Sequence, residues 1–170
     1  MLADPNYQNT ASRLKAFGKY SGSVTNSTDP LGGGRVEVLV PDVHGDKAVW
    51  ALPCVPYAEP NLGFFMIPPV DALVWIEFAG GDRNKAIWSG CYWKDQQAPS
   101  KDVEEMLIAT PKAKLRFNVK SPAANILLEL ENGTSIAIKD NSIIIDSGGT
   151  GKVEVTNSGT KINGSALEVS

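Results

Sequence analysis

The sequence predicts an all-β protein built from two different β architectures. In the first 105 of the 170 residues, short apolar runs alternate with turn signals roughly every 8 to 12 residues, as in a small barrel or sandwich. In the last 65 residues the apolar residues come as pairs two positions apart, which is typical of short one-sided strands. Twelve of the thirteen aromatic residues lie in the first part, so the two parts need different cores.

The first part contains six strand candidates after a possible short helix at residues 7–17. Turns rich in Gly, Pro and Asp separate these strands. Trp50, Trp75 and Trp88 lie in or beside three different strands, and we expect their large side chains to fill one barrel interior. The six strand candidates are residues 20–24, 35–40, 49–55, 63–67, 72–78 and 86–92.

The second part predicts strands that cannot bury their apolar residues within one chain. A single copy would expose an apolar face and open strand edges, which invites aggregation. A stacked solenoid or three chains wound around a common axis would bury these residues, and the uneven spacing favours three chains. The residues expected to pack along that axis are Leu115, Phe117, Ile126, Leu128, Ile136, Ile138, Ile143, Ile145, Val153, Val155, Ile162, Leu167 and Val169.

Charge and hydropathy exclude several classes of protein. The first 105 residues carry 9 basic and 13 acidic groups, a net charge of −4, and the last 65 carry 7 and 6, a net charge of +1. Neither part is a basic surface, so we expect no nucleic acid partner. No apolar run is long enough to span a membrane, and the N-terminus lacks the pattern of a signal peptide. We therefore expect assembly in the cytoplasm without a signal peptide.

The reactive and metal-binding residue types of the sequence form no recognisable site. We therefore expect no catalytic residue, no metal site and no cofactor. His44, the single histidine, lies in a predicted solvated turn and cannot supply the ligands of a zinc site or a nucleophilic triad alone. The glycines at 148–151 precede Lys152 but lack two defining positions of a phosphate loop, so a turn between strands is expected. Cys54 and Cys91 lie in apolar strands and are expected to be reduced and buried.

A series of motifs between residues 16 and 93 resembles a known family. The matching segments are Gly34–Val38, Val40-Pro41, His44–Asp46, Trp50-Ala51, Gly63–Pro68, Val70–Phe78, Gly81-Asp82 and Ala86–Gly90. In this order they resemble the OB-fold domain of the central spikes of contractile injection machines, namely phage baseplate assembly protein V and the valine-glycine-repeat spikes of type VI secretion. The resemblance implies an OB-fold whose core contains Val36, Val38, Trp50, Phe64, Val74, Ile76 and Ile87.

The resemblance also implies a domain organisation and a set of partners. Residues 1–15 would form an N-terminal arm, 16–93 the OB-fold barrel, 94–105 a linker, and 106–170 an intertwined trimeric β-helix or β-prism. The chain would then be a structural homotrimer, the membrane-piercing spike of a phage tail baseplate or related injection particle. Its other partners would be a baseplate hub protein and the target cell envelope.

Two other functions and the nature of the tip stay open at this point. Some similar spikes carry a lysozyme domain, but residues 94–106 are too few to hold one, and Asp102, Glu104 and Glu105 fit an acidic linker. An OB-fold can also bind oligonucleotides or oligosaccharides, although the negative charge disfavours phosphates.

No histidine follows His44, so the His-x-His iron site of some relatives is excluded. Either Leu167 and Val169 close the end of the rod, or a separate PAAR-type tip protein covers that end. The sequence ends at Ser170, directly after the last predicted strand, and we expect this to favour a separate tip protein.

Overall fold

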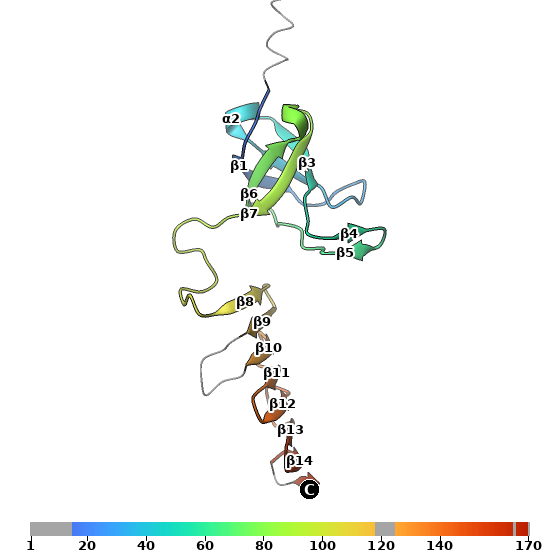
Figure 1. The fold of residues 1–170 in the computed structure, drawn as a ribbon, viewed down its shortest axis with the longest axis vertical. Coiled ribbons are helices and arrows are strands. Elements are labelled where there is room, and N and C mark those ends of the chain that lie inside the picture. The colour runs from blue at the N-terminus through green and yellow to red at the C-terminus, as the bar shows by residue number, and fades with distance from the viewer. Residues whose placement is uncertain (1–14, 118–124, 165, 170) are drawn as a thin grey trace, which may run out of the picture. The chain divides into compact units, whose positions relative to one another are not determined.

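The computed structural model describes residues 15–117, 125–164 and 166–169, apart from the side chains of Glu168 and Val169. The chain divides into two compact units, Met1–Gln96 and Gln97–Ser170, and both are built mainly of β-strands (Figure 1). The predicted fold class is confirmed: the chain is all-β, with a barrel followed by a β-rich C-terminal unit. The predicted linker, residues 94–105, spans the division. The predicted N-terminal arm and short helix lie almost wholly outside the described residues.

Five strands of the first unit close into a barrel in the order β1-β2-β3-β7-β6. The strands are β1 (Tyr20–Asn26), β2 (Val36–Leu39), β3 (Ala48–Pro53), β6 (Leu73–Phe78) and β7 (Ala86–Cys91). The β3–β7 pair is parallel, and the other four pairs are antiparallel. A five-stranded barrel of this kind is the OB-fold architecture that the resemblance implies.

The barrel core follows the alternation of its strands, with some corrections to the predicted core. Val36, Val38, Val74 and Ile76 are fully buried, as predicted. Trp50 and Ile87 are only half-buried, because each alternates with a buried neighbour that takes the inward position. Phe64 is 48% exposed and lies outside the core. Of the three tryptophans expected to fill the interior, only Trp88 is buried.

The segment between β3 and β6 differs most from the prediction. Instead of a strand over residues 63–67, it forms a small hairpin of β4 (Ala58–Glu59) and β5 (Leu62–Gly63), which projects from the barrel (Figure 1). Gly63 has a φ of +145°, and a Cβ there would lie 2.7 Å from the carbonyl oxygen of Tyr57. The tight backbone approach therefore requires glycine and ends the strand at this residue.

His44 and the two cysteines are also placed differently from the prediction. His44 ends a single helical turn, α2 (Pro41–His44), and is half-buried rather than solvated. Its ring packs edge-on against Phe78, and its Nε2 lies 3.1 Å from the carbonyl oxygen of Arg83. Cys54 and Cys91 are free thiols, but both are exposed, because one follows the end of β3 and the other ends β7.

The second unit is one antiparallel sheet of eight strands that follow each other in chain order (Figure 1). Its strands are β8 (Met106–Ala109), β9 (Ala113–Phe117), β10 (Ile126–Leu130), β11 (Ser135–Ile138), β12 (Ser142–Asp146), β13 (Lys152–Thr156), β14 (Gly159–Ile162) and β15 (Leu167–Val169). The glycine cluster forms the predicted turn between β12 and β13. A Cβ on Gly148 would lie 2.7 Å from the carbonyl oxygen of Asn132, so the turns of successive hairpins stack closely.

Candidate functional site

Two rows of mainly apolar side chains cross all eight strands on one face of the C-terminal sheet. Residues paired directly across neighbouring strands lie on the same face, so each row can be followed through the register. The first row is Met106, Phe117, Ile126, Ile138, Ile143, Val155, Thr160 and Val169, and the second is Ile108, Leu115, Leu128, Ile136, Ile145, Val153, Ile162 and Leu167. These sixteen residues form the apolar face of the sheet.

Within the described part of the chain, most of the apolar face is uncovered. The exposed fraction is 40% for Ile136 and Ile138, 44% for Ile143 and 48% for Ile145. Among the described residues, every residue of the buried hydrophobic core belongs to the first unit, so the second unit has no such core of its own. A continuous exposed apolar surface of this kind marks an interaction site.

All residues predicted to pack along a common axis fall on the apolar face. The side chain of Val169 lies outside the described part, but its backbone pairs with Thr160 at the end of the first row. The sequence reasoning missed Met106 and Ile108, although they show the same i, i+2 spacing as the other pairs. That these side chains meet at a threefold axis stays a prediction.

The other face of the sheet carries an ionic cluster near its first strands. Arg116 on β9 donates from Nη2 to Glu129 on β10 at 2.9 Å, and its Nη1 also pairs with Glu105. A hydrogen bond from Ser100 and the positive charge of Arg116 lower the pKa of Glu105. The end of the linker is thereby bound to the sheet, so one member of the predicted acidic cluster has a structural partner.

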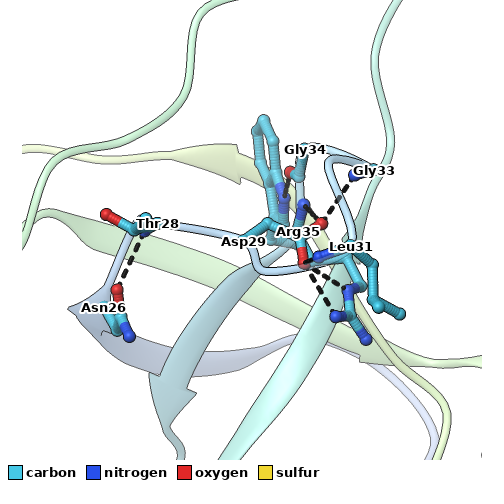
Figure 2. Close-up of polar contacts among 8 residues, drawn as sticks. Asn26, Thr28, Asp29, Leu31, Gly33, Gly34 and Arg35 are labelled. Carbon is cyan, nitrogen blue, oxygen red and sulfur yellow. Dashed lines mark hydrogen bonds and ion pairs between the residues drawn. The ribbon is translucent and has the colours of Figure 1, made fainter.

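In the barrel, the loop between β1 and β2 is organised around one carboxylate (Figure 2). Asp29 accepts hydrogen bonds from the backbone N–H groups of Leu31 (3.0 Å), Gly33 (2.7 Å) and Arg35 (3.2 Å). It also accepts two from the Arg35 guanidinium, from Nε at 3.0 Å and from Nη2 at 2.7 Å. The side chain of Asp29 is only 4% exposed, so the carboxylate acts as the centre of the loop.

The electrostatics of this loop favour a charged Asp29. The Arg35 guanidinium, supported by the three backbone donors, holds the pKa of Asp29 far below its usual range. The guanidinium also lies 5.0 Å from the centre of the Trp50 ring, which gives a cation–π contact. The sequence reasoning missed this site and identified only a turn rich in Gly, Pro and Asp between two strands. An Asp before a Pro-x-Gly turn was the available signal, because Asp side chains bind backbone N–H groups in turns.

The described residues contain neither a metal-binding cluster nor a membrane-spanning helix. Within them, no group of three or more His, Cys, Asp or Glu side chains is arranged to hold a metal ion. No helix in the part of the chain that the structure describes is both long and apolar enough to cross a membrane.

Two protein families match the chain, one for each unit. The type VI secretion system/phage-baseplate injector OB domain matches residues 20–93, which contain the barrel. The phage baseplate V C-terminal trimerisation domain matches residues 105–168, which contain the apolar face except Val169. No curated protein matches the chain.

An OB-fold barrel followed by a trimerising β-sheet defines a structural component of a baseplate or injector, present in a virion or an injection particle. The chain belongs to the central spike family of contractile injection machines, which includes phage baseplate assembly protein V. Its C-terminal unit is a trimerisation domain, so the working protein is a homotrimer.

The single polar side chain on the apolar face gives a prediction of increased stability. Thr160 pairs with Val155 and Val169, so its hydroxyl lies in an otherwise apolar row. We expect Thr160→Val to raise the Tm of the trimer and to stabilise each chain by about 1 kcal/mol. Thr156→Val is the matched control and should lower the Tm, because the Thr156 hydroxyl donates to the carbonyl oxygen of Gly159 at 3.1 Å. Calorimetry checks both; a lower Tm for Thr160→Val would contradict the prediction.

Proposed function

We propose that the protein is the membrane-piercing central spike of a contractile injection machine. In this proposal the C-terminal sheets of three chains form a rod that meets the target cell envelope. The three OB-fold barrels attach the rod to the baseplate hub. When the machine contracts, the rod carries the force to a small area of the envelope.

The observation that carries the proposal is the continuous apolar face. It crosses all eight strands with Thr160 as its one polar member, and strands spaced about 4.8 Å apart give a ladder about 34 Å long. Backbone hydrogen bonds on both sides hold each interior strand within its own chain. Burying three such faces together joins the chains along their whole length, so no strand can leave the rod alone.

The strand order supports a separate partner at the end of the rod. Within the described residues β15 is the last strand of the sheet, paired with β14 on one side only. Leu167 on this strand is 54% exposed. An open strand edge beside an apolar side chain is a surface that another protein can extend or cover, and a PAAR-type tip protein would fit this place.

Attachment to the hub can be tested with purified components. The protein is co-expressed with a baseplate hub protein of the same injection machine, and the complex is measured by size-exclusion chromatography with light scattering. We expect a stable complex that contains three copies of the spike. Recovery of a free spike trimer and free hub protein, at concentrations well above micromolar, would contradict the attachment.

Piercing is tested separately, with particles that carry either the wild-type chain or a trimer-deficient variant. Vesicles of target-envelope lipid, loaded with a fluorescent dye, are mixed with the particles while sheath contraction is triggered. We expect dye release only from particles with the wild-type spike. Equal dye release by contracted particles that lack a trimeric spike would show that another component pierces the envelope.

A further inference from the structure

The last part of the linker, residues 100–105, is a folded turn rather than an open connector. Asp102 accepts hydrogen bonds from two later residues: its Oδ1 from the N–H of Glu104 at 3.0 Å, and its carbonyl oxygen from the N–H of Glu105 at 3.2 Å. The hydroxyl oxygen of Ser100 accepts a hydrogen bond from the N–H of Asp102 at 3.1 Å. Turns of this kind fix the backbone locally. Residues 100–105 therefore form a compact strap directly before β8.

A hydrogen bond closes the strap between its first and last residues. The Ser100 hydroxyl donates to the Glu105 carboxylate and lowers the pKa of that group. Ser100 and Glu105 are half-buried, whereas the four residues between them are exposed. Val103, near the middle, is 98% exposed. The contacts of the strap are therefore concentrated at its two ends, and its middle faces solvent.

One arginine of the sheet binds the end of the strap. Arg116 on β9 pairs directly with Leu107 on β8 and with Leu127 on β10, so these three side chains lie on one face, opposite the apolar face. Glu105 comes two residues before Leu107, and strand alternation directs it to the same face. Glu129 comes two residues after Leu127 and lies there too. The guanidinium between the two carboxylates binds Glu105 through Nη1 and Glu129 through Nη2.

The two ion pairs are partly shielded from water. The side chains of Glu105 and Arg116 are 20% and 23% exposed, and that of Glu129 is 32% exposed. Because the guanidinium offers separate N–H groups, it binds both carboxylates at once. One arginine thus has two different tasks: it joins β9 to β10 through Glu129, and it attaches the strap through Glu105.

Attachment of the strap shortens the connection between the barrel and the C-terminal sheet. Fourteen residues, 92–105, separate β7 from β8, and an extended chain of that length spans at most about 50 Å. With the strap attached, at most residues 92–99 can extend, which reduces the limit to about 30 Å. The division between the two compact units falls within this remaining stretch, after Gln96.

We propose that the ion pair between Arg116 and Glu105 is a latch that sets the length of the linker. While the latch is closed, the strap belongs to the C-terminal sheet and the linker is short. When it opens, the linker gains its full length without a change in the pairing of β8 with β9. Glu129 keeps the guanidinium paired in both states, so opening leaves no uncompensated cation.

The latch lies where a load on the linker arrives first. Force that pulls a barrel away from its C-terminal sheet passes along the chain through the strap before it reaches β8, so the latch opens before any strand is pulled from the sheet. The latch goes beyond the spike role and is independent of it, because its contacts all lie within the C-terminal unit. It requires neither attachment to a hub nor piercing.

Hydrogen–deuterium exchange of the full-length trimer tests the latch with two matched variants. Glu105→Gln and Glu129→Gln each remove one carboxylate from Arg116 and change the charge equally, but only Glu105 belongs to the strap. In Glu105→Gln we expect the backbone amides of residues 100–105 to exchange about threefold faster than in the wild type, because the strap is open more often. In Glu129→Gln these amides should exchange at the wild-type rate. Light scattering before exchange establishes that each sample is trimeric.

Unchanged exchange of the strap in Glu105→Gln, or equal acceleration by both variants, would overturn the proposal and leave the spike role intact. A double-mutant cycle is the second measurement. In an Arg116→Gln background the strap should already exchange rapidly, and adding Glu105→Gln should accelerate it no further. If Glu105→Gln has its full effect without Arg116, Glu105 acts through Ser100 alone, and the proposal is overturned.

Discussion

Ile138→Asp is expected to convert the homotrimer into monomers. Ile138 pairs with Ile126 on one side and with Ile143 on the other, in the middle of the apolar face. In the trimer three carboxylates would lie at the same level among aliphatic side chains, without cationic partners. Burying an uncompensated charge costs about 3–5 kcal/mol per chain, and the three charges also repel each other. Light scattering should therefore show one chain instead of three.

Lys139→Asp is the matched control for this variant. Lys139 is the next residue along the chain, so strand alternation directs its side chain to the other face of the sheet. The Lys139→Asp substitution also introduces a carboxylate, but at a position that already carries a charge, and we expect the trimer to persist. The barrel should keep its own melting transition in both variants. An Ile138→Asp protein that is still trimeric, with an unchanged Tm, would show that the apolar face is not the trimer interface.

Asp29→Asn is expected to lower the Tm of the barrel by several degrees. The carboxylate accepts five hydrogen bonds in the wild type, including two from Arg35. An amide of the same size keeps only one acceptor oxygen and turns N–H groups toward other donors, so several of these bonds are lost. Asp46→Asn, at an exposed turn position, is the control and should leave the Tm nearly unchanged. Thermal denaturation followed by circular dichroism measures both variants.

The same carboxylate makes barrel stability depend on pH. The fold holds the pKa of Asp29 well below its ordinary value of 3.8, so the folded protein favours the charged form more than the unfolded chain does. The stability from Asp29 is therefore fully present above about pH 4 and is lost as the pH falls from there toward the folded pKa. Between pH 5 and pH 2 the Tm of the wild type should fall more steeply than that of Asp29→Asn. Parallel curves would mean that other groups cause the acid sensitivity.

The strands and the apolar face could be predicted because both depend on alternation along the chain. Val36, Val38, Val74 and Ile76 alternate with less buried residues, so the sequence alone identified the inward positions. In the second unit the same period, with turn residues at each end, placed the predicted pairs on one face. Periodicity of two is a local property, and it needs no knowledge of distant contacts.

The remaining features depend on contacts that a local pattern does not contain. Val49, Trp50 and Ala51 are all apolar, so the pattern does not say which of them faces inward, and the small Ala51 takes that place. Phe64 follows Gly63, whose positive φ and close approach to Tyr57 end the strand. The five bonds of Asp29 form only when the loop returns to Arg35. Each of these outcomes is decided by tertiary packing rather than by strand propensity.

The absence of a buried hydrophobic core from the described part of the second unit has a consequence for how the protein is made. The barrel has its core within one chain and can fold as soon as it is synthesised, at a rate independent of concentration. The C-terminal sheet gains its apolar contacts only when chains meet, so its folding and its association are one reaction. The two halves of one polypeptide thus obey different rate laws, and the number of finished spikes depends more steeply on expression level than the number of chains does.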